Sequence, residues 1–303
     1  MTGSWPALEL HEWVETRDTL QLWLQVVGKV RLARTPPINH SWHATLYVTA
    51  RGLTTSPIPH GEREFQIDLD FIDHRLAINV SDGSRGGFSL EPQSVAAFYE
   101  HVMAELHRLD LDTQIVARPN ELPDPILPFA RDQVHRHYDK DAVNRFWQIL
   151  VQTDRVMREF RSRFIGKCSP IHLFWGAMDL AVTRFSGRIA PTHPGGIPNL
   201  PDRVTREAYS HEVSSCGFWS GTAPVDYPAF YAYAYPQPAG FAEADVRPSG
   251  AFFSKDFGEF ILPYAVVREA ASPDDTLLDF LQSTYVAAAD LGNWDRAGLE
   301  RKA

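Results

Sequence analysis

Apolar residues recur at helical spacing in four segments of the chain. Between Thr16 and Arg34 they recur every three or four positions, which gathers them into one stripe along a helix. Lys29 lies near the C-terminal end of this segment, where the helix dipole favours a cation. The same spacing predicts further helices over residues 94–109, 139–164 and 276–291.

Strict alternation of apolar and polar residues over residues 65–80 predicts a β-hairpin. We expect its turn at Asp73 and His74, because the apolar side chains of both strands then lie on one face. The expected pairs are Phe71 with Leu76, Leu69 with Ile78, and Ile67 with Val80. The glycine-rich string "SDGSRGG" follows as a second turn, so the hairpin is predicted to extend into a meander.

Further strands are predicted at four places, with Gly176 as a turn or bulge inside the first of them. They cover residues 171–185, 208–218, 229–235 and the string "GEFILPY". Strands in hairpin groups, separated by helices without β-α-β alternation, predict an α+β fold in which several long helices cover a mainly antiparallel sheet. We expect one globular domain over residues 1–303; the alternative is two lobes, 1–118 and 129–303, joined by a proline-rich crossover.

Charge and composition narrow the class of protein. The formal net charge of −9 argues against a nucleic-acid partner, because phosphate binding needs a basic surface. The two cysteines do not make a disulfide framework, and no apolar run is long enough for a signal peptide or a membrane span. We therefore expect a soluble, cytoplasmic protein that does not bind membranes.

The string "AYSHEVSSCGFW", residues 208–219, contains the first candidate chemistry. His211 and Glu212 begin like a zinc-protease motif, but position 215 is a serine and the segment reads as a strand. On a strand, Glu212 shares a face with Ser214 and Cys216, and that face either is solvated or lines a site. We take His211 and Glu212 as the candidate catalytic pair.

A second candidate is a metal site in the string "NHSWHATLYVTARG". His40 and His43 can turn toward one point, and two histidines with a carboxylate are a recognised set for a divalent metal such as zinc, iron or manganese. The carboxylate could come from Glu212, Asp68, Asp70 or Asp179, and further nitrogen ligands from His172, His193 or His211. The alternative is that these histidines satisfy buried backbone groups.

Substrate recognition is assigned to arginines and aromatic residues beside predicted strands. Arg51 and Arg184 suit an anionic group, and Trp42 and Trp219 belong to an aromatic-rich set that suits the wall of a small-molecule site. Surface charge and an ordinary aromatic core are the competing interpretations. The sequence contains no dinucleotide fingerprint, no phosphate loop, no C-x-x-C and no G-x-S-x-G elbow.

Four long strings carry a resemblance to a known family: "NHSWHATLYVTARGLTTSPIP", "FIGKCSPIHLFWGAMDLAVTRFSGR", "SHEVSSCGFW" and "GEFILPY". The chain resembles, from about Trp13 to Trp294, a bacterial family of domains of unknown function, serial 5996. The resemblance implies a stand-alone unit. It carries no activity, substrate or cofactor.

The residues favour an enzyme with a polar His/Glu/Arg pocket for a small molecule, acting by metal-assisted hydrolysis or oxidation. Two alternatives stay open. One is a non-catalytic protein whose aromatic cavity binds a small ligand, and the other is an interaction subunit whose exposed aromatic residues pair with another chain.

Overall fold

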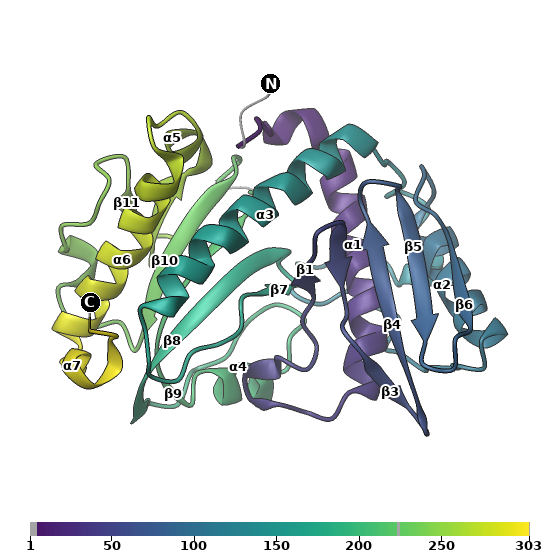
Figure 1. Cartoon of the computed structure of the whole chain (residues 1–303), viewed down its shortest axis with the longest axis horizontal. Helices are drawn as coiled ribbons and strands as arrows, with labels where there is room; N and C mark the ends of the chain where they lie inside the picture. Colours follow the sequence, from purple (N-terminus) through teal and green to yellow (C-terminus); the bar gives the residue numbers. More distant parts are fainter. Residues whose placement is uncertain (1–4, 223–224, 303) are drawn as a thin grey trace.

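The computed structural model describes residues 5–222 and 225–302 (Figure 1). The helices are α1 Leu10–Arg34, η1 Asn39–Ser41, α2 Val95–Arg108, η2 Phe129–Arg131, α3 Lys140–Ser162, α4 Asp202–Ala208, η3 Phe241–Glu243, α5 Tyr264–Arg268, α6 Pro273–Leu291 and α7 Arg296–Leu299. The strands are β1 Tyr47–Val48, β2 Gly52–Thr54, β3 Ile58–His60, β4 Arg63–Asp70, β5 Arg75–Val80, β6 Arg85–Ser89, β7 His172–Phe174, β8 Asp179–Ile189, β9 His211–Trp219, β10 Ala229–Tyr235, β11 Phe252–Ser254 and β12 Glu259–Pro263.

Two antiparallel six-stranded sheets form the framework, which confirms the predicted α+β class. The first has the order β1-β2-β4-β5-β6, with β3 paired to β4, and the second has the order β11-β12-β10-β9-β8-β7. In each half of the chain a long helix precedes the sheet and another follows it: α1 and α2 in the first half, α3 and α6 in the second. The apolar core includes side chains from both sheets.

The hairpin of β4 and β5 forms with a register two residues away from the predicted one. Leu69 faces Leu76 and Ile67 faces Ile78, and the turn runs from residue 71 to residue 74. A shift of two residues keeps every side chain on its predicted face, so alternation alone does not distinguish the two registers. The carboxylate of Asp70 makes the difference, because it accepts the backbone N–H groups that follow it at 2.8 Å and fixes the wider turn.

Helix α1 begins six residues before the predicted start and is buried on nearly all sides. Its polar side chains Gln21, Gln25 and Lys29 recur every four residues and so form one stripe. Gln21 donates to the backbone carbonyl of Gly176 at 2.6 Å, and Gln25 makes two hydrogen bonds to the backbone of Asn120. Lys29 is 4% exposed and donates to the Asn120 side chain, so it is a buried contact and not the terminal cation that the sequence predicts.

Replacing Gly28 with alanine will destabilise the protein although alanine favours helices. A Cβ atom at Gly28 would lie 2.2 Å from the indole ring of Trp175, which is itself fixed by its N–H donating to the Ala44 carbonyl at 2.7 Å. Overpacking of this kind costs about 1–3 kcal/mol, more than the gain in helix propensity of about 1 kcal/mol. Urea denaturation of Gly28→Ala, with the exposed His11→Ala as control, measures the change. An increase in stability would show that Trp175 moves freely.

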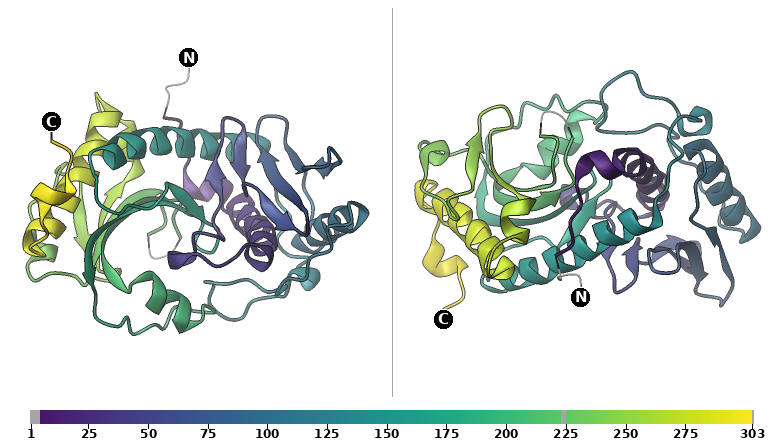
Figure 2. Two further views of the ribbon diagram at one scale, coloured as in Figure 1. Left: turned by 60° about the horizontal axis from the view of Figure 1, so that its bottom comes forward. Right: turned by 90° about the horizontal axis from the view of Figure 1, so that it is seen from above.

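The β7–β12 sheet curves strongly, with α3 and α6 on its convex side (Figure 2). Leu180, Val182 and Phe218 point toward these helices and belong to the core. The alternate side chains point to the other side, which we call the concave face. It comprises Asp179, Ala181, Thr183 and Phe185 of β8 and the side chains aligned with them on β7, β9, β10 and β12.

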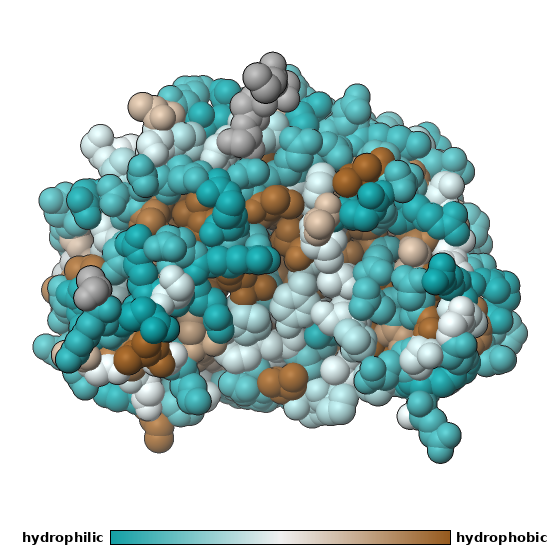
Figure 3. Space-filling view, viewed as in Figure 1, coloured by the Kyte–Doolittle hydropathy of each residue, from teal (hydrophilic) through white to brown (hydrophobic). Residues whose placement is uncertain are grey.

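Helices α2, α3 and α6 begin and end close to the predicted limits, whereas the short helices α4, α5 and α7 were not predicted. Helix α4 ends at Ala208, the first residue of the segment predicted as a strand over residues 208–218. That strand, β9, starts at His211. No helix among the described residues has both the length and the apolar character needed to cross a membrane. The surface that carries α3 and the β1–β6 sheet is mainly hydrophilic (Figure 3).

Candidate functional site

The concave face collects carboxyl and hydroxyl groups from distant parts of the chain. Strand register places Ser215 between Thr183 and Tyr233 in the middle of this face. Tyr231, two residues before Tyr233 on β10, lies on the same face. Glu259 begins β12 on the same side. A face of this composition is unsuited to a dry core, and most of these side chains keep part of their surface accessible.

Gly217 allows the tyrosines to reach across the sheet. The Tyr231 ring crosses β9 over Gly217, where a Cβ atom would lie 2.4 Å from the phenol oxygen and 2.6 Å from the carbonyl of Leu180. Because this path is open, the Tyr231 hydroxyl donates a hydrogen bond to the carboxylate of Asp179, two strands away. Any larger residue at this position would displace the ring.

The charge of Asp179 acts on two further carboxyl groups here, those of Glu121 and Glu259. Burial raises the pKa of Asp179 to about 6. Burial and then the charge of Asp179 raise the pKa of Glu121 to about 7 and that of Glu259 to about 8. Among the described residues, no lysine, arginine or histidine forms a salt bridge with any of the three. Protonation is therefore the way in which this face limits its charge near neutral pH.

Glu121 reaches the site from the long segment between α2 and α3. Its backbone has φ of +60°, and its carboxylate lies against Gly176, where a Cβ atom would be 2.0 Å from Oε1. Lys29 of α1 lies on this side, and its charge opposes the upward shift of the Glu121 pKa. Burial in turn lowers the pKa of Lys29 to about 8. The polar stripe of α1 thus sets the position of the third carboxyl group.

A chain of hydroxyl groups crosses the centre of the face. The hydroxyls of Tyr209 and Tyr233 are 2.7 Å apart, Tyr233 is hydrogen-bonded to Ser215, and Ser215 Oγ lies 2.8 Å from Thr183 Oγ1. Burial raises the pKa of both tyrosines, that of Tyr209 to about 12, so both phenols stay protonated at neutral pH. Such a chain can donate or accept hydrogen bonds at any point along its length.

Two histidines border the face beside β7 and β8. His172 of β7 is paired with Ala181 of β8 in the strand register. Its Nδ1 lies 2.8 Å from the carbonyl of Pro170, so Nδ1 carries the proton. His40 is hydrogen-bonded to the backbone of Ala208. Burial lowers the pKa of His40 to about 4 and that of His172 to about 3, so both rings are neutral at physiological pH.

Each of these imidazoles leaves one nitrogen without a partner. His40 Nδ1 and His172 Nε2 are buried and have no hydrogen-bond partner among the described residues, and the same is true of Trp42 Nε1. The His40 ring stacks on Trp42 at 5.0 Å and lies 6.1 Å from the ring of Tyr209. The histidine border and the tyrosine chain are therefore one continuous surface.

The predicted catalytic pair lies away from this surface. Glu212 points to the helix side of β9 and pairs with Arg188 at 2.6 Å, while Arg188 also donates to the carbonyls of Gly292 and Asn293 at the end of α6. This pair therefore caps α6. His211 is exposed at the start of β9. Its ring contacts only Ser210 among the described polar side chains, at 3.1 Å.

The face of β9 that the sequence singles out as polar points into the core. Ser214 and Cys216 are buried toward α3 and α6, beside Arg184. The register explains the difference: Ser215 and Gly217, one step along, point to the concave face.

Arg184 is 1% exposed and does not reach the concave face. Its guanidinium lies 3.5 Å from the centre of the Phe160 ring and 4.2 Å from that of Tyr285, and it donates to the Phe160 carbonyl. A substrate anion has no access to it.

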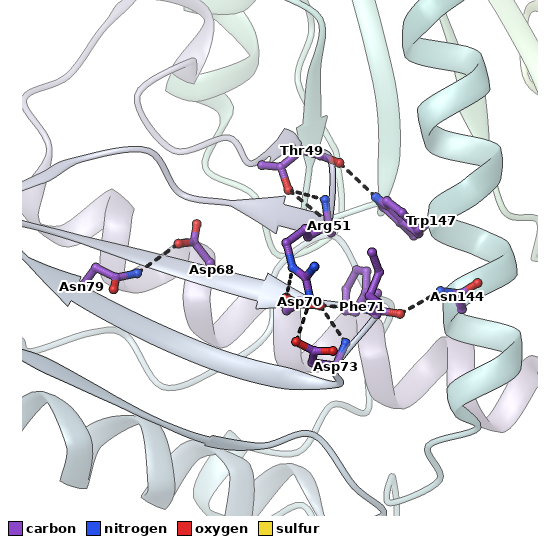
Figure 4. Close-up of polar contacts among 11 residues, drawn as sticks. Thr49, Arg51, Asp68, Asp70, Phe71, Asp73, Asn79, Asn144 and Trp147 are labelled. Atoms are coloured by element: carbon purple, nitrogen blue, oxygen red, sulfur yellow. Dashed lines mark hydrogen bonds and ion pairs between the residues drawn. The ribbon is translucent and has the colours of Figure 1, made fainter.

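Arg51 lies on the outside of the β1–β6 sheet, between β1 and β2 (Figure 4). It pairs with Asp70 at 2.5 Å and with Asp73 at 2.6 Å, so its charge is matched within the hairpin turn. Asp68 lies on the same outer surface, where it accepts hydrogen bonds from Gln66 and Asn79. These groups stabilise the turn and the strand surface.

The predicted metal set does not assemble. No group of three or more His, Cys, Asp or Glu side chains within residues 5–222 and 225–302 is arranged to hold a metal ion. His40 turns toward Phe174 and Phe185, whereas His43 Nδ1 accepts the backbone N–H of Ile38 at 3.1 Å. His193 stacks on Tyr209 at 4.8 Å, at the rim of the concave face.

A family model described as a family of unknown function (DUF5996) matches residues 5–301. The chain belongs to this family. No curated protein and no solved structure matches it. The function of this DUF5996 protein therefore has to be argued from its own side chains.

Sequence reasoning placed some residues of this site and missed others. His40, His172, Asp179, Trp42 and Trp219 are candidates from the sequence that lie on or beside the concave face. Tyr231 and Tyr233 belong to the aromatic-rich set that the sequence offered for the wall of a small-molecule site, but their hydroxyl groups were given no role. The residues that it did not single out are Glu121, Tyr209, Ser215 and Glu259. The string "AFYAYAY" held a usable signal, because three tyrosines at alternate positions put three hydroxyl groups on one face of a strand.

Proposed function

We propose that this protein is an enzyme that acts on a small molecule at the concave face by general acid–base catalysis. The observation that carries the proposal is the group of three partly buried carboxyl groups, Glu121, Asp179 and Glu259, which have no cation in salt-bridge contact among the described residues. Holding such groups together costs the folded protein several kcal/mol, and packing gains nothing from it. Shifted carboxyl groups of this kind are concentrated at catalytic sites.

The environments of the carboxyl groups suggest separate roles. Asp179, with a pKa of about 6, is mostly ionised at neutral pH and suits a general base. Glu259, with a pKa of about 8, is mostly protonated and suits a general acid. Tyr231 is a positioning residue, since its hydroxyl donates to the Asp179 carboxylate and orients it. Trp219, aligned with Asp179 on the next strand, offers a flat apolar surface to a substrate.

Incubation with a bacterial metabolite extract, followed by untargeted mass spectrometry, tests the proposal without a chosen substrate. The parent protein should convert at least one metabolite, and Asp179→Asn or Glu259→Gln should slow that conversion by about 10²–10⁴-fold. The exposed Glu62→Gln is the matched control. The rate should be highest between pH values of about 6 and 8, because the base must be ionised and the acid protonated. Conversion by both variants at the parental rate, or no conversion of any metabolite, would contradict it.

A further inference from the structure

We propose that the concave face binds a small organic amine as its ammonium ion, with a hydroxyl-bearing aromatic body that lies against the histidine border. This inference rests on the proposed function, since it names the substrate class of the same site. It combines three features of the described residues: carboxyl groups without a salt bridge, partly accessible aromatic faces, and buried ring nitrogens that lack partners.

Among the described residues, no cation is in salt-bridge contact with the carboxyl groups. The charge of Lys29 acts on Glu121, but its ammonium group donates to the Asn120 side chain and forms no salt bridge with any of the three. Within residues 5–222 and 225–302 no three acidic, histidine or cysteine side chains are arranged for a metal ion, so the ligand that we propose is an organic cation. An organic ammonium ion can contact two or three carboxylates at once through separate N–H groups.

The aromatic rings around these carboxyl groups favour the same ligand. Tyr231 and Tyr233 are nearly parallel, with centres 6.1 Å apart and planes 14° apart, and both are close to Glu259. Trp219 is aligned with Asp179, and Tyr209 borders Tyr233. Carboxylates flanked by tyrosine and tryptophan faces are the usual environment of ammonium ligands, because the ring faces attract cations.

The histidine border, which consists of His40 and His172, is proposed to contact the hydroxyl-bearing end of the ligand. His40 is 7% exposed and His172 is 0% exposed, and each has a ring nitrogen without a partner in the part of the chain that the structure describes. In the neutral rings these nitrogens are hydrogen-bond acceptors, whereas Trp42 Nε1, also without a partner, is a donor. Leaving such groups unsatisfied is costly, and one hydroxyl group can donate to an imidazole and accept from the indole. His40 is also held with φ of +59°.

Isothermal titration calorimetry with three matched probes tests the proposal at about pH 7, where the carboxyl groups are partly protonated. Tyramine carries both features, tyrosol replaces the ammonium group by a hydroxyl, and 2-phenylethylamine lacks the phenol hydroxyl. Tyramine should bind at least about tenfold more tightly than either analogue. Titrations in buffers of different ionisation enthalpy should show proton release with the two amines, because a bound cation favours the ionised carboxyl groups.

Substitutions test which side chains contact the ammonium end of the ligand and which contact its hydroxyl end. Asp179→Asn with Glu259→Gln should weaken tyramine binding by at least about tenfold and reduce the proton release to the share of Glu121, with less effect on tyrosol. His40→Phe retains the stacked ring and should weaken tyramine but leave 2-phenylethylamine unchanged. His172→Phe serves as the second variant if His40→Phe does not fold, as judged by its thermal transition.

The outcomes separate this inference from the proposed function. Tyrosol binding as tightly as tyramine, or no binding of either amine, would overturn the ammonium proposal even if a neutral metabolite is converted. Preference for tyramine with proton release would support the ammonium proposal, even if no amine is turned over. In that case the proposed acid–base function would fail, whereas the proposed ligand class would stand.

Discussion

The protein will lose about 2–3 kcal/mol of stability between pH values of about 6.5 and 8.5. The folded pKa values of Glu121 and Glu259, about 7 and about 8, lie above the ordinary glutamate value of 4.5. The folded state therefore binds more protons than the unfolded state in this window, and stability falls as the pH rises through it. The loss is smaller than the separate shifts suggest, because they share mutual repulsion and each group is partly accessible.

The buried histidines produce the opposite slope below this window. Their folded pKa values, about 4 for His40 and about 3 for His172, lie below the ordinary value of 6.5. In the unfolded state these two rings bind more protons below a pH of about 6.5, which lowers stability there and opposes the carboxyl contribution. Because the carboxyl contribution begins near the ordinary glutamate value of 4.5, the two effects offset one another between pH values of about 4.5 and 6.5, and the loss above about 6.5 is not offset.

Urea denaturation at half-unit pH intervals measures this alkaline limb, the loss of stability above a pH of about 6.5. The combined variant Glu121→Gln, Asp179→Asn and Glu259→Gln should flatten the alkaline limb and be more stable than the parent at pH 8. The exposed Glu62→Gln should follow the parent curve. An alkaline limb that persists in the combined variant would show that other groups cause it, and would remove the electrostatic basis of the site.

Arg184→Ala will lose about 3–4 kcal/mol of folding free energy. The guanidinium is packed between the rings of Phe160 and Tyr285, on α3 and α6, and also lies 5.0 Å from the Phe164 ring centre. Truncation removes the three ring contacts and the hydrogen bond to the Phe160 carbonyl, and leaves a cavity between the helices and the sheet.

Arg184→Met distinguishes packing from charge. Methionine fills most of the volume without burying a cation that lacks a carboxylate partner, so this variant should lose less than half as much as the alanine variant. Arg203→Ala, at an exposed position of α4, is the control and should change stability by less than about 0.5 kcal/mol. Equal losses in the methionine and alanine variants would mean that the cation itself, and not its volume, stabilises the helix packing.

Local patterns carried the information on secondary structure and on class. Apolar spacing located the four long helices because each has an apolar stripe. Helix α1 extends furthest beyond its stripe, since it is buried on nearly all sides. Alternation assigned the hairpin side chains to their faces. It could not set the register, which depends on hydrogen bonds from Asp70 to the turn.

The candidate site could not be obtained in this way because it depends on which strands are neighbours. Alternation divides β9 into two faces but does not say which face the helices cover. Helices α3 and α6 cover Ser214 and Cys216. Ser215 and Gly217 therefore lie on the concave face, the same face as Asp179 and Glu259. The open space over Gly217 then permits the contact between Tyr231 and Asp179.

The sequence by itself determined the α+β class, the long helices and the residue types available for chemistry, because these follow from short-range periodicity and composition. Only the tertiary structure decided which of them meet. The tertiary structure brings Glu121 and Glu259 near Asp179, although they lie 58 and 80 positions from it along the chain. It also buries Arg184 in the core. The physical reason is that sheet pairing and helix burial act between distant segments, and local propensity does not encode them.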